Sequence, residues 1–239
     1  MESENKGNVF FCRHFQSEHN NGEQNGLPGH LDPLSKTGIK QGNRVGRVLA
    51  NFFRDNGFGD RSVKILSTTF VRGVDSVEII SEQIWRYITN VETDPALIEW
   101  GAMASAGISM MTKSVFYPLK NENDVLMCKD SQERLLEILA KIDGDYGRFA
   151  ADAPEKAPPN VLVMSHATVL NKMMQYLLCE ISDAWDPNKT FNNGTIRRLK
   201  SDGEGKFAYK GVIHPGFAPI SEQEIQFRIW RRGKQYGAA

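Results

Sequence analysis

Residues 9–14 read Val-Phe-Phe-Cys-Arg-His, a short apolar run that ends in an arginine and a histidine. Valine and phenylalanine favour strands, and an apolar run of this length bounded by polar residues is typical of a strand. The sequence therefore predicts a strand at 8–13, with Arg13 and His14 at its carboxyl end.

The same order of apolar strand, polar side chain and helix occurs twice more along the chain. A strand at 63–67 precedes Arg72, and a strand at 161–164 precedes His166. In open α/β sheets, ligands bind beyond the carboxyl ends of the strands, where helix N-termini also point their N–H groups. We therefore expect these segments to converge on one anion-binding site of an α/β protein.

The segments between these strands supply the rest of the predicted domain. The other predicted elements are a loop at 20–34, helices at 36–54, 71–87, 131–150 and 168–178, and a hairpin at 190–213. Segment 101–129 is the hardest to assign, and we interpret it as an insertion or lid beside the site. Residues 1–239 are expected to form a single domain.

The composition describes a folded protein without a strong overall charge. Hydrophobic residues make up 40% of the 239 residues, which is enough for a substantial core. Basic and acidic residues number 29 each, and the scattered basic ones argue against a nucleic-acid or membrane surface. Three cysteines fit a reducing compartment better than a disulfide framework. We therefore expect a cytoplasmic protein that binds neither nucleic acid nor membrane.

The residue types at the predicted site suit phosphoryl transfer. A neutral imidazole of His14 can attack phosphorus in line and hold the phosphoryl group, provided that its other ring nitrogen keeps a proton. The guanidinium groups of Arg13 and Arg72 can hold the non-bridging oxygens through paired donors. His166, if protonated beside the phosphate, would donate a further hydrogen bond to the developing negative charge.

A carboxylate is needed to complete the reaction. Glu99 is the candidate general acid for the leaving oxygen and general base for the attacking water, with Glu92 and Asp94 as nearby alternatives. Asn20 can add a neutral donor to the phosphate, although a role in forming the turn fits it almost as well. Ser17, in the same stretch, fits a role in capping a helix.

At these positions the chain resembles the histidine phosphatase superfamily, in its phosphoglycerate mutase-like branch. The similar stretches are Arg13-His14-Phe15-Gln16-Ser17-Glu18-His19-Asn20, Asp32-Pro33-Leu34-Ser35 with Gly38, Ser67-Thr68-Thr69-Phe70-Val71-Arg72, Leu97-Ile98-Glu99-Trp100-Gly101 and Ser165-His166-Ala167. They follow the family's order from residue 8 to about residue 200. The resemblance implies a three-layer α/β/α sandwich with a mostly parallel central sheet, a phosphohistidine mechanism, and no metal or other cofactor.

Some positions depart from that family's pattern. Phe15 replaces the glycine after the histidine, and Ala167 replaces the glycine of the second motif. We expect the Phe15 ring to narrow the phosphate pocket. Mutases of the family also follow the acid with Arg-His-Tyr-Gly, whereas residues 100–103 here are Trp-Gly-Ala-Met. We therefore expect a metal-independent phosphatase that acts on a small phosphomonoester.

Other classes of protein stay open at the level of the sequence. The chain could be a mutase-type phosphoryl transferase, or a phosphate-binding regulatory protein with little or no turnover. A metal-dependent hydrolase with ligands such as His14, His19 and Asp32 is a third class, although their spacing matches no ligand pair on one helix face. A homodimer is one possible assembly.

Overall fold

The computed structural model describes residues 7–22, 27, 31–94, 97, 160–178, 191–201 and 207–218, without the side chains of 168, 172 and 175–177. Its elements are β1 (Asn8–Arg13), the short 3-10 helix η1 (His19–Asn21), α1 (Lys36–Asp55), β2 (Val63–Ser67), α2 (Val71–Ile84), the 3-10 helix η3 (Trp85–Tyr87), β3 (Ile88–Thr93), β4 (Asn160–Ser165), α6 (Ala167–Leu177), β5 (Asn193–Ser201) and β6 (Phe207–Phe217). The segment predicted as an insertion, 101–129, and the helix predicted at 131–150 lie outside the described residues.

One sheet of six strands forms the centre of the described fold, in the order β3-β2-β4-β1-β5-β6. β3, β2, β4 and β1 run parallel, whereas β5 and β6 pair antiparallel at one edge. The prediction of a mostly parallel sheet is therefore confirmed.

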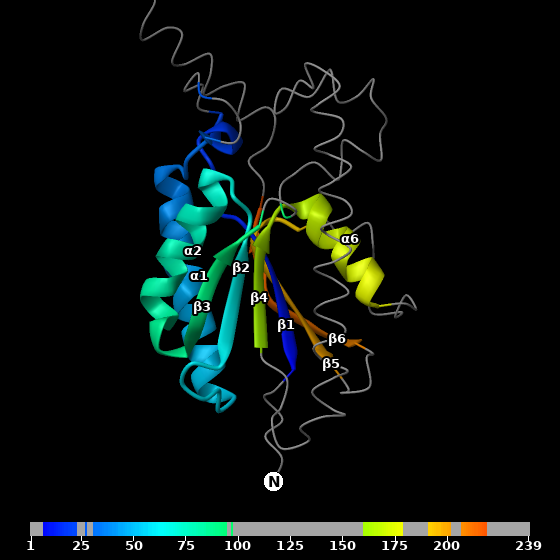
Figure 1. Cartoon of the computed structure of the whole chain (residues 1–239). Coiled ribbons are helices and arrows are strands. Elements are labelled where there is room, and N and C mark those ends of the chain that lie inside the picture. The colour runs from blue at the N-terminus through cyan, green and yellow to red at the C-terminus, as the bar shows by residue number, and fades with distance from the viewer. Residues whose placement is uncertain are drawn as a thin grey trace, which may run out of the picture.

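The two faces of the central strands are covered by different helices (Figure 1). Along β1, the buried residues Val9 and Phe11 pack in the cluster that includes α6, while Phe10 and Cys12 pack in the cluster that includes α1 and α2. Successive side chains of a strand point to opposite faces, so a strand covered on both sides must be apolar throughout. This explains the unbroken apolar run of β1 and confirms the three-layer architecture.

The connections after β1 and β4 leave the sheet toward opposite faces. These strands are neighbours, but the helix after β1 covers one face of the sheet and the helix after β4 covers the other. Open α/β sheets bind ligands beyond the carboxyl ends of strands at such a switch point. His14 directly follows β1, and His166 directly follows β4.

Helix α1 begins where the sequence predicts it. The side-chain oxygen of Ser35 accepts a hydrogen bond from the backbone N–H of Gly38, which caps the first turn. Gly38 lies so close to the backbone of Gln16 that a Cβ at this position would collide with the Gln16 carbonyl. The missing side chain therefore lets α1 approach the segment that follows His14.

Two peripheral elements had different outcomes. The hairpin prediction is confirmed, since β5 and β6 pair antiparallel, with the predicted turn residues 202–205 outside the described part. Strand β3 was not predicted, because this edge strand is exposed at five of its six residues and lacks an alternating apolar pattern. The predicted helix at 71–87 instead ends at Ile84, followed by the 3-10 turn η3.

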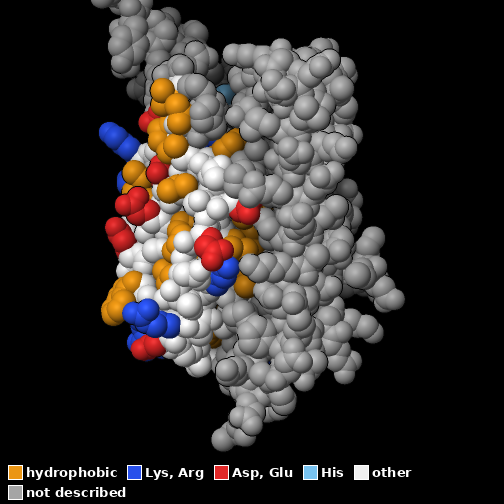
Figure 2. Space-filling view, viewed as in Figure 1, with side chains coloured by type: hydrophobic (Ala, Val, Ile, Leu, Met, Phe, Trp, Pro, Cys, Tyr) orange, Lys and Arg blue, Asp and Glu red, His pale blue; other side chains and the backbone are white. Residues whose placement is uncertain are grey.

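The surface of the described residues carries both signs of charge. On the face shown in Figure 2, basic and acidic side chains are interspersed among hydrophobic ones, without a patch of one sign. No helix within the described ranges is long and apolar enough to span a membrane.

Candidate active site

His14 is held in a defined tautomer. Its backbone N–H donates to the carbonyl of Ser165 at 3.0 Å, which ties the ends of β1 and β4 together. The ring nitrogen Nδ1 lies 2.7 Å from the Phe15 carbonyl oxygen, which only accepts, so Nδ1 must carry the proton. The other nitrogen, Nε2, accepts from Nε of Arg72 at 3.3 Å. Nε2 therefore presents the lone pair that a nucleophilic imidazole requires.

The charge state of His14 agrees with this tautomer. The side chain is only 2% exposed, and this burial is the main cause that holds its pKa well below the ordinary value. The positive charges of Arg72 and Arg13 and the nearby His166 lower the pKa further, while the hydrogen bond to Phe15 opposes the shift. His14 is thus neutral at physiological pH.

Arg72 connects the two histidines. It lies in the first turn of α2 and is 2% exposed, with Nε on His14 and Nη2 at 3.4 Å from Nδ1 of His166. Its guanidinium also stacks on the ring of Phe70, 4.8 Å from the ring centroid. Because a guanidinium is planar and permanently charged, Arg72 fixes the relative orientation of both rings.

His166 is the residue before the first turn of α6 and is fully buried. Its ring centroid lies 4.9 Å from that of His14, and its Nε2 lies 3.4 Å from the hydroxyl of Thr68. Burial first, and then the charges of Arg72 and Arg13, hold its pKa well below the ordinary value. In the free protein His166 is therefore neutral, whereas the donor role expected from the sequence assumes protonation beside a phosphate.

Arg13 contacts the segment that precedes β5. It is half-buried at the end of β1, and its Nη1 donates to the carbonyl of Phe191 at 2.6 Å. Asn20 lies in η1, where its backbone N–H donates to the Ser17 hydroxyl at 3.3 Å. The Ser17 hydroxyl therefore stabilises the turn that contains η1.

The candidate acid, Glu99, lies outside the described residues. Leu97, two positions earlier, is buried, and its carbonyl accepts from the Ser165 hydroxyl at 2.6 Å. Of the alternatives, Glu92 is exposed on β3 and pairs with Lys64 at 2.7 Å. Asp94 directly follows β3, and its backbone N–H donates to Ser67 at 2.8 Å. Neither contact identifies Glu92 or Asp94 as the general acid or base.

The Phe15 ring, which we expected to narrow the phosphate pocket, packs instead into the core on the α1 side of the sheet. A Cβ added at Gly42 of α1 would lie 2.8 Å from ring carbon Cε2, and one added at Gly194 of β5 would lie 3.2 Å from Cδ1. Two glycines thus provide the volume that the ring occupies. The correction follows from packing between distant elements, which the local sequence does not show.

Gly42→Ala is therefore expected to destabilise the fold, although alanine is the better helix former. The new methyl would overlap both the Phe15 ring and Ile79, 2.8 Å away, and overpacking of this kind costs about 1–3 kcal/mol. The gain in helix propensity of about 1 kcal/mol offsets only part of that cost. Chemical denaturation would measure the change, with Gly59→Ala as the control, because no atom lies within 4 Å of that position. Equal stability of the two variants would contradict this packing.

The described residues do not form the metal site that a metal-dependent hydrolase would need. Within the described ranges, no group of three or more His, Cys, Asp or Glu side chains is arranged to hold a metal ion. His19 is exposed, and its backbone N–H donates to the buried carboxylate of Asp32 at 3.1 Å. This contact gives Asp32 a structural role in the loop after His14.

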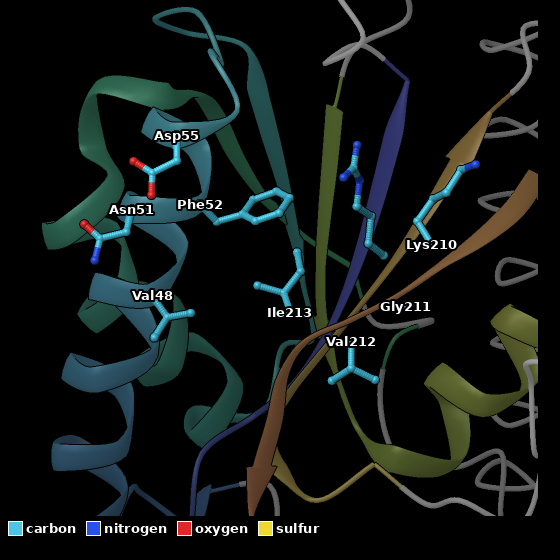
Figure 3. A pocket seen from close by; sticks show the side chains of 9 residues that line it. Val48, Asn51, Phe52, Asp55, Lys210, Gly211, Val212 and Ile213 are labelled. Carbon is cyan, nitrogen blue, oxygen red and sulfur yellow. The ribbon is translucent and has the colours of Figure 1, made fainter.

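A separate groove of about 440 Å³ lies between α1 and the β5–β6 hairpin. Figure 3 shows Phe52 of α1 and Ile213 of β6 pointing into the space between these elements, with Asn51 and Asp55 at the helix. None of the residues assigned to phosphate chemistry lines this groove.

Three residues that support the site were not singled out from the sequence. Thr68 contacts His166, Ser76 accepts from the Phe15 backbone N–H at 3.0 Å, and Asn193 donates to the His14 carbonyl at 3.1 Å. Thr68 follows a strand end, as both histidines do, and Ser76 is a polar residue on the buried face of α2. Both positions could therefore have been recognised as unusual from the sequence. Asn193 is 179 positions from His14, and no pattern in the sequence indicates their contact.

Two neutral histidines bridged by a buried arginine lie together at the carboxyl ends of β1 and β4, where the resemblance to histidine phosphatases leads us to expect the phosphate. The family model for the histidine phosphatase superfamily (branch 1) matches residues 9–211, so the chain belongs to this superfamily.

Solved structures with the same fold include both phosphatases and a mutase. The protein histidine phosphatase SixA, complexed with tungstate, is 14% identical, with a TM-score of 0.54 over 87% of this chain and 97% of that one. The alpha-ribazole phosphatase of Shigella flexneri is 13% identical, with a TM-score of 0.55 over 90% of this chain and 100% of that one. The phosphoglycerate mutase of Bacillus anthracis is 12% identical, with a TM-score of 0.51 over 94% of this chain and 97% of that one. No curated protein matches the sequence. These similarities establish the fold and leave the reaction to be argued from the site.

Proposed function

We propose that this protein is a phosphomonoester hydrolase that works through a phosphohistidine intermediate on His14. The observation that carries the proposal is the tautomer of His14, with a proton on Nδ1 held by the Phe15 carbonyl and a lone pair on Nε2. An imidazole that attacks phosphorus requires a lone pair of this kind, and here the lone pair faces the guanidinium of Arg72.

In the first step, Nε2 of His14 forms a bond to phosphorus and the ester P–O bond breaks. Arg72 moves its donors from the imidazoles to the phosphate oxygens, and Arg13 supplies a second guanidinium. Both interactions strengthen as charge builds on the oxygens, so they favour the transition state over the substrate. Glu99 gives its proton to the leaving oxygen in this proposal.

In the second step, water attacks phosphorus and the N–P bond breaks, which releases inorganic phosphate and returns His14 to its neutral form. Glu99 takes the proton from the water. A bound phosphate dianion would raise the pKa of His166, because an opposite charge nearby favours the protonated form. His166 would then donate to the phosphate, as the sequence predicts, although it is neutral without one.

Hydrolysis is preferred over phosphoryl transfer between substrates because of the sequence after Glu99. Residues 100–103 are Trp-Gly-Ala-Met and lack the basic residues with which mutases of the family bind a second anionic group. The small and apolar residues at 102–117 further favour a leaving group that is not strongly acidic. We propose that a small-molecule phosphomonoester is the substrate.

Other expectations are proposals of the same kind. The balance of 29 basic and 29 acidic residues supports a partner other than nucleic acid or an anionic membrane. The three cysteines support a cytoplasmic location. A single domain with a lid at 101–129, and a homodimer as the assembly, complete the proposal.

The experiment that tests this function combines turnover with covalent trapping. A small aryl phosphate is incubated with the protein in the presence of a chelator, released phosphate is measured, and the protein is quenched in alkali, where phosphohistidine survives. We expect release of phosphate and a phosphoryl group that maps to His14. Turnover only in the absence of chelator would support the metal-dependent alternative. Phosphate binding without turnover of aryl, sugar or nucleotide phosphates would support the regulatory alternative.

A further inference from the structure

The peptide group between Phe15 and Gln16 contacts the candidate nucleophile on one side and helix α1 on the other. Its carbonyl oxygen accepts from Nδ1 of His14 at 2.7 Å. Its N–H donates to the side-chain oxygen Oε1 of Gln41 at 2.9 Å. Because a peptide group is planar, a constraint on its N–H also constrains the direction of its carbonyl. Gln41 and His14 therefore act on the two ends of one rigid unit.

Gln41 is well placed to provide this constraint. It is only 7% exposed and lies on the buried face of α1, one turn from Gly38, where most neighbouring positions are apolar or glycine. Its amide orientation is determined, because a backbone N–H requires an oxygen acceptor. Gly38 lies close to the carbonyl of Gln16, and the Ser35 N–H donates to that carbonyl at 3.0 Å. These contacts fix the distance between α1 and the next peptide group, between Gln16 and Ser17.

The preceding peptide group, between His14 and Phe15, is held in the same way by other elements. Asn193 of β5 donates to its carbonyl at 3.1 Å, and its N–H donates to the Ser76 hydroxyl at 3.0 Å. Ser76 in turn donates to the Arg72 carbonyl at 2.6 Å. Gln41, Ser76 and Asn193 thus hold the two peptide groups that flank Phe15. Gln41 holds the one whose oxygen contacts the imidazole, so its effect on His14 is the most direct.

We infer that Gln41 is a positioning residue that aims the Phe15 carbonyl at Nδ1 of His14 and so turns the Nε2 lone pair toward the phosphate. This role rests on the proposed phosphohistidine mechanism. The hydrogen bond from the Gln16 N–H to Gln41 also polarises the peptide, which makes its carbonyl a better acceptor for the imidazole N–H. Gln41 itself contacts neither His14 nor the phosphate in this scheme.

The test compares two replacements of Gln41 with a control on the same helix. Gln41→Met keeps the length of the side chain but removes the acceptor, whereas Gln41→Glu keeps an oxygen that accepts from the Gln16 N–H. Asn43→Leu is the control, because the Asn43 amide donates only to the carbonyl of Ile39 in its own helix. The chemical shift and exchange rate of the His14 Nδ1 proton are measured by NMR, together with kcat and its pH dependence.

In Gln41→Met we expect the Nδ1 proton to exchange faster with water and kcat to fall about 10- to 100-fold, by analogy with the loss of groups that orient metal-binding histidines. The acidic limb of kcat should move to lower pH, because the hydrogen bond to Phe15 raises the pKa of His14 and its loss lowers it. A merely structural role would not move this limb. Asn43→Leu should resemble the intact protein in all three measurements. Gln41→Glu should keep the slowly exchanging Nδ1 proton and most of kcat, while its carboxylate raises the pKa of His14 and moves the acidic limb to higher pH.

An unchanged Nδ1 proton and unchanged kcat in Gln41→Met would overturn the inference. So would loss of the Nδ1 signal in a folded Gln41→Glu protein, since that variant retains the acceptor and keeps the test decisive even if Gln41→Met does not fold. The proton measurement needs no substrate, so it tests the positioning role even if the intact protein proves inactive. Inactivity of the intact protein would instead count against the proposed function.

Discussion

Replacement of His14 by alanine is expected to lower kcat for an aryl phosphate by at least about 10⁴-fold, the order of loss caused by removing an enzymatic nucleophile. The variant retains Arg13, Arg72 and His166, but no lone pair is left at the position of Nε2 to accept the phosphoryl group. Alkali-stable labelling by the substrate should disappear with the activity. Binding of inorganic phosphate should persist, because the guanidinium groups remain. Steady-state kinetics with chelator, and phosphate titration, measure the two effects separately.

His19→Ala is the matched control for this loss. His19 is an exposed histidine five residues further along the chain, and a metal-dependent mechanism through His14 and His19 predicts that both variants are inactive. The phosphohistidine mechanism predicts that His19→Ala keeps kcat within about twofold of the intact protein, as expected for a surface substitution away from the chemistry. Equal losses in the two variants would contradict our assignment of the nucleophile.

Arg72→Lys is expected to lower kcat by about 10²- to 10³-fold, the cost of removing one preorganised donor at a charged transition state. Lysine keeps the positive charge, but a single ammonium cannot replace a planar group whose Nε and Nη2 reach His14 and His166 at 3.3 and 3.4 Å. The stacking on Phe70 is also lost. A lysine variant with nearly full kcat would show that charge alone suffices at this position.

The pH dependence separates the charge of Arg72 from its geometry. Burial and, after it, the positive charge of Arg72 lower the pKa of His14, and only neutral His14 can attack, so the intact protein should stay active well below pH 6.5. Arg72→Met removes the charge, which raises the pKa of His14 and moves the acidic limb of kcat/KM to higher pH. In Arg72→Lys the limb should stay near its original position. The pH profiles of both variants, measured on one aryl phosphate, test the sign of the shift.

Much of the fold follows from local patterns in the chain. The apolar runs at β1 and β4 are visible in the sequence, because a strand covered on both faces must be apolar. The Ser35 cap of α1 and the polar residues that end each strand are visible there too. The convergence of Arg13, His14, Arg72 and His166 follows in turn, because parallel neighbouring strands bring their carboxyl ends to one edge. Strand β3 could not be predicted from an apolar pattern, because five of its six residues are exposed.

The sequence by itself determined that His14, Arg72 and His166 meet, because each follows a strand whose carboxyl end lies at the same edge of the sheet. Only the tertiary structure decided how His14 is protonated and oriented, through a carbonyl of Phe15 that is aimed by Gln41 from another element. It also decided that His166 is neutral in the free protein and that Phe15 packs into the core. Burial and hydrogen-bond partners depend on contacts between residues far apart in the chain, and a local pattern contains no information on either.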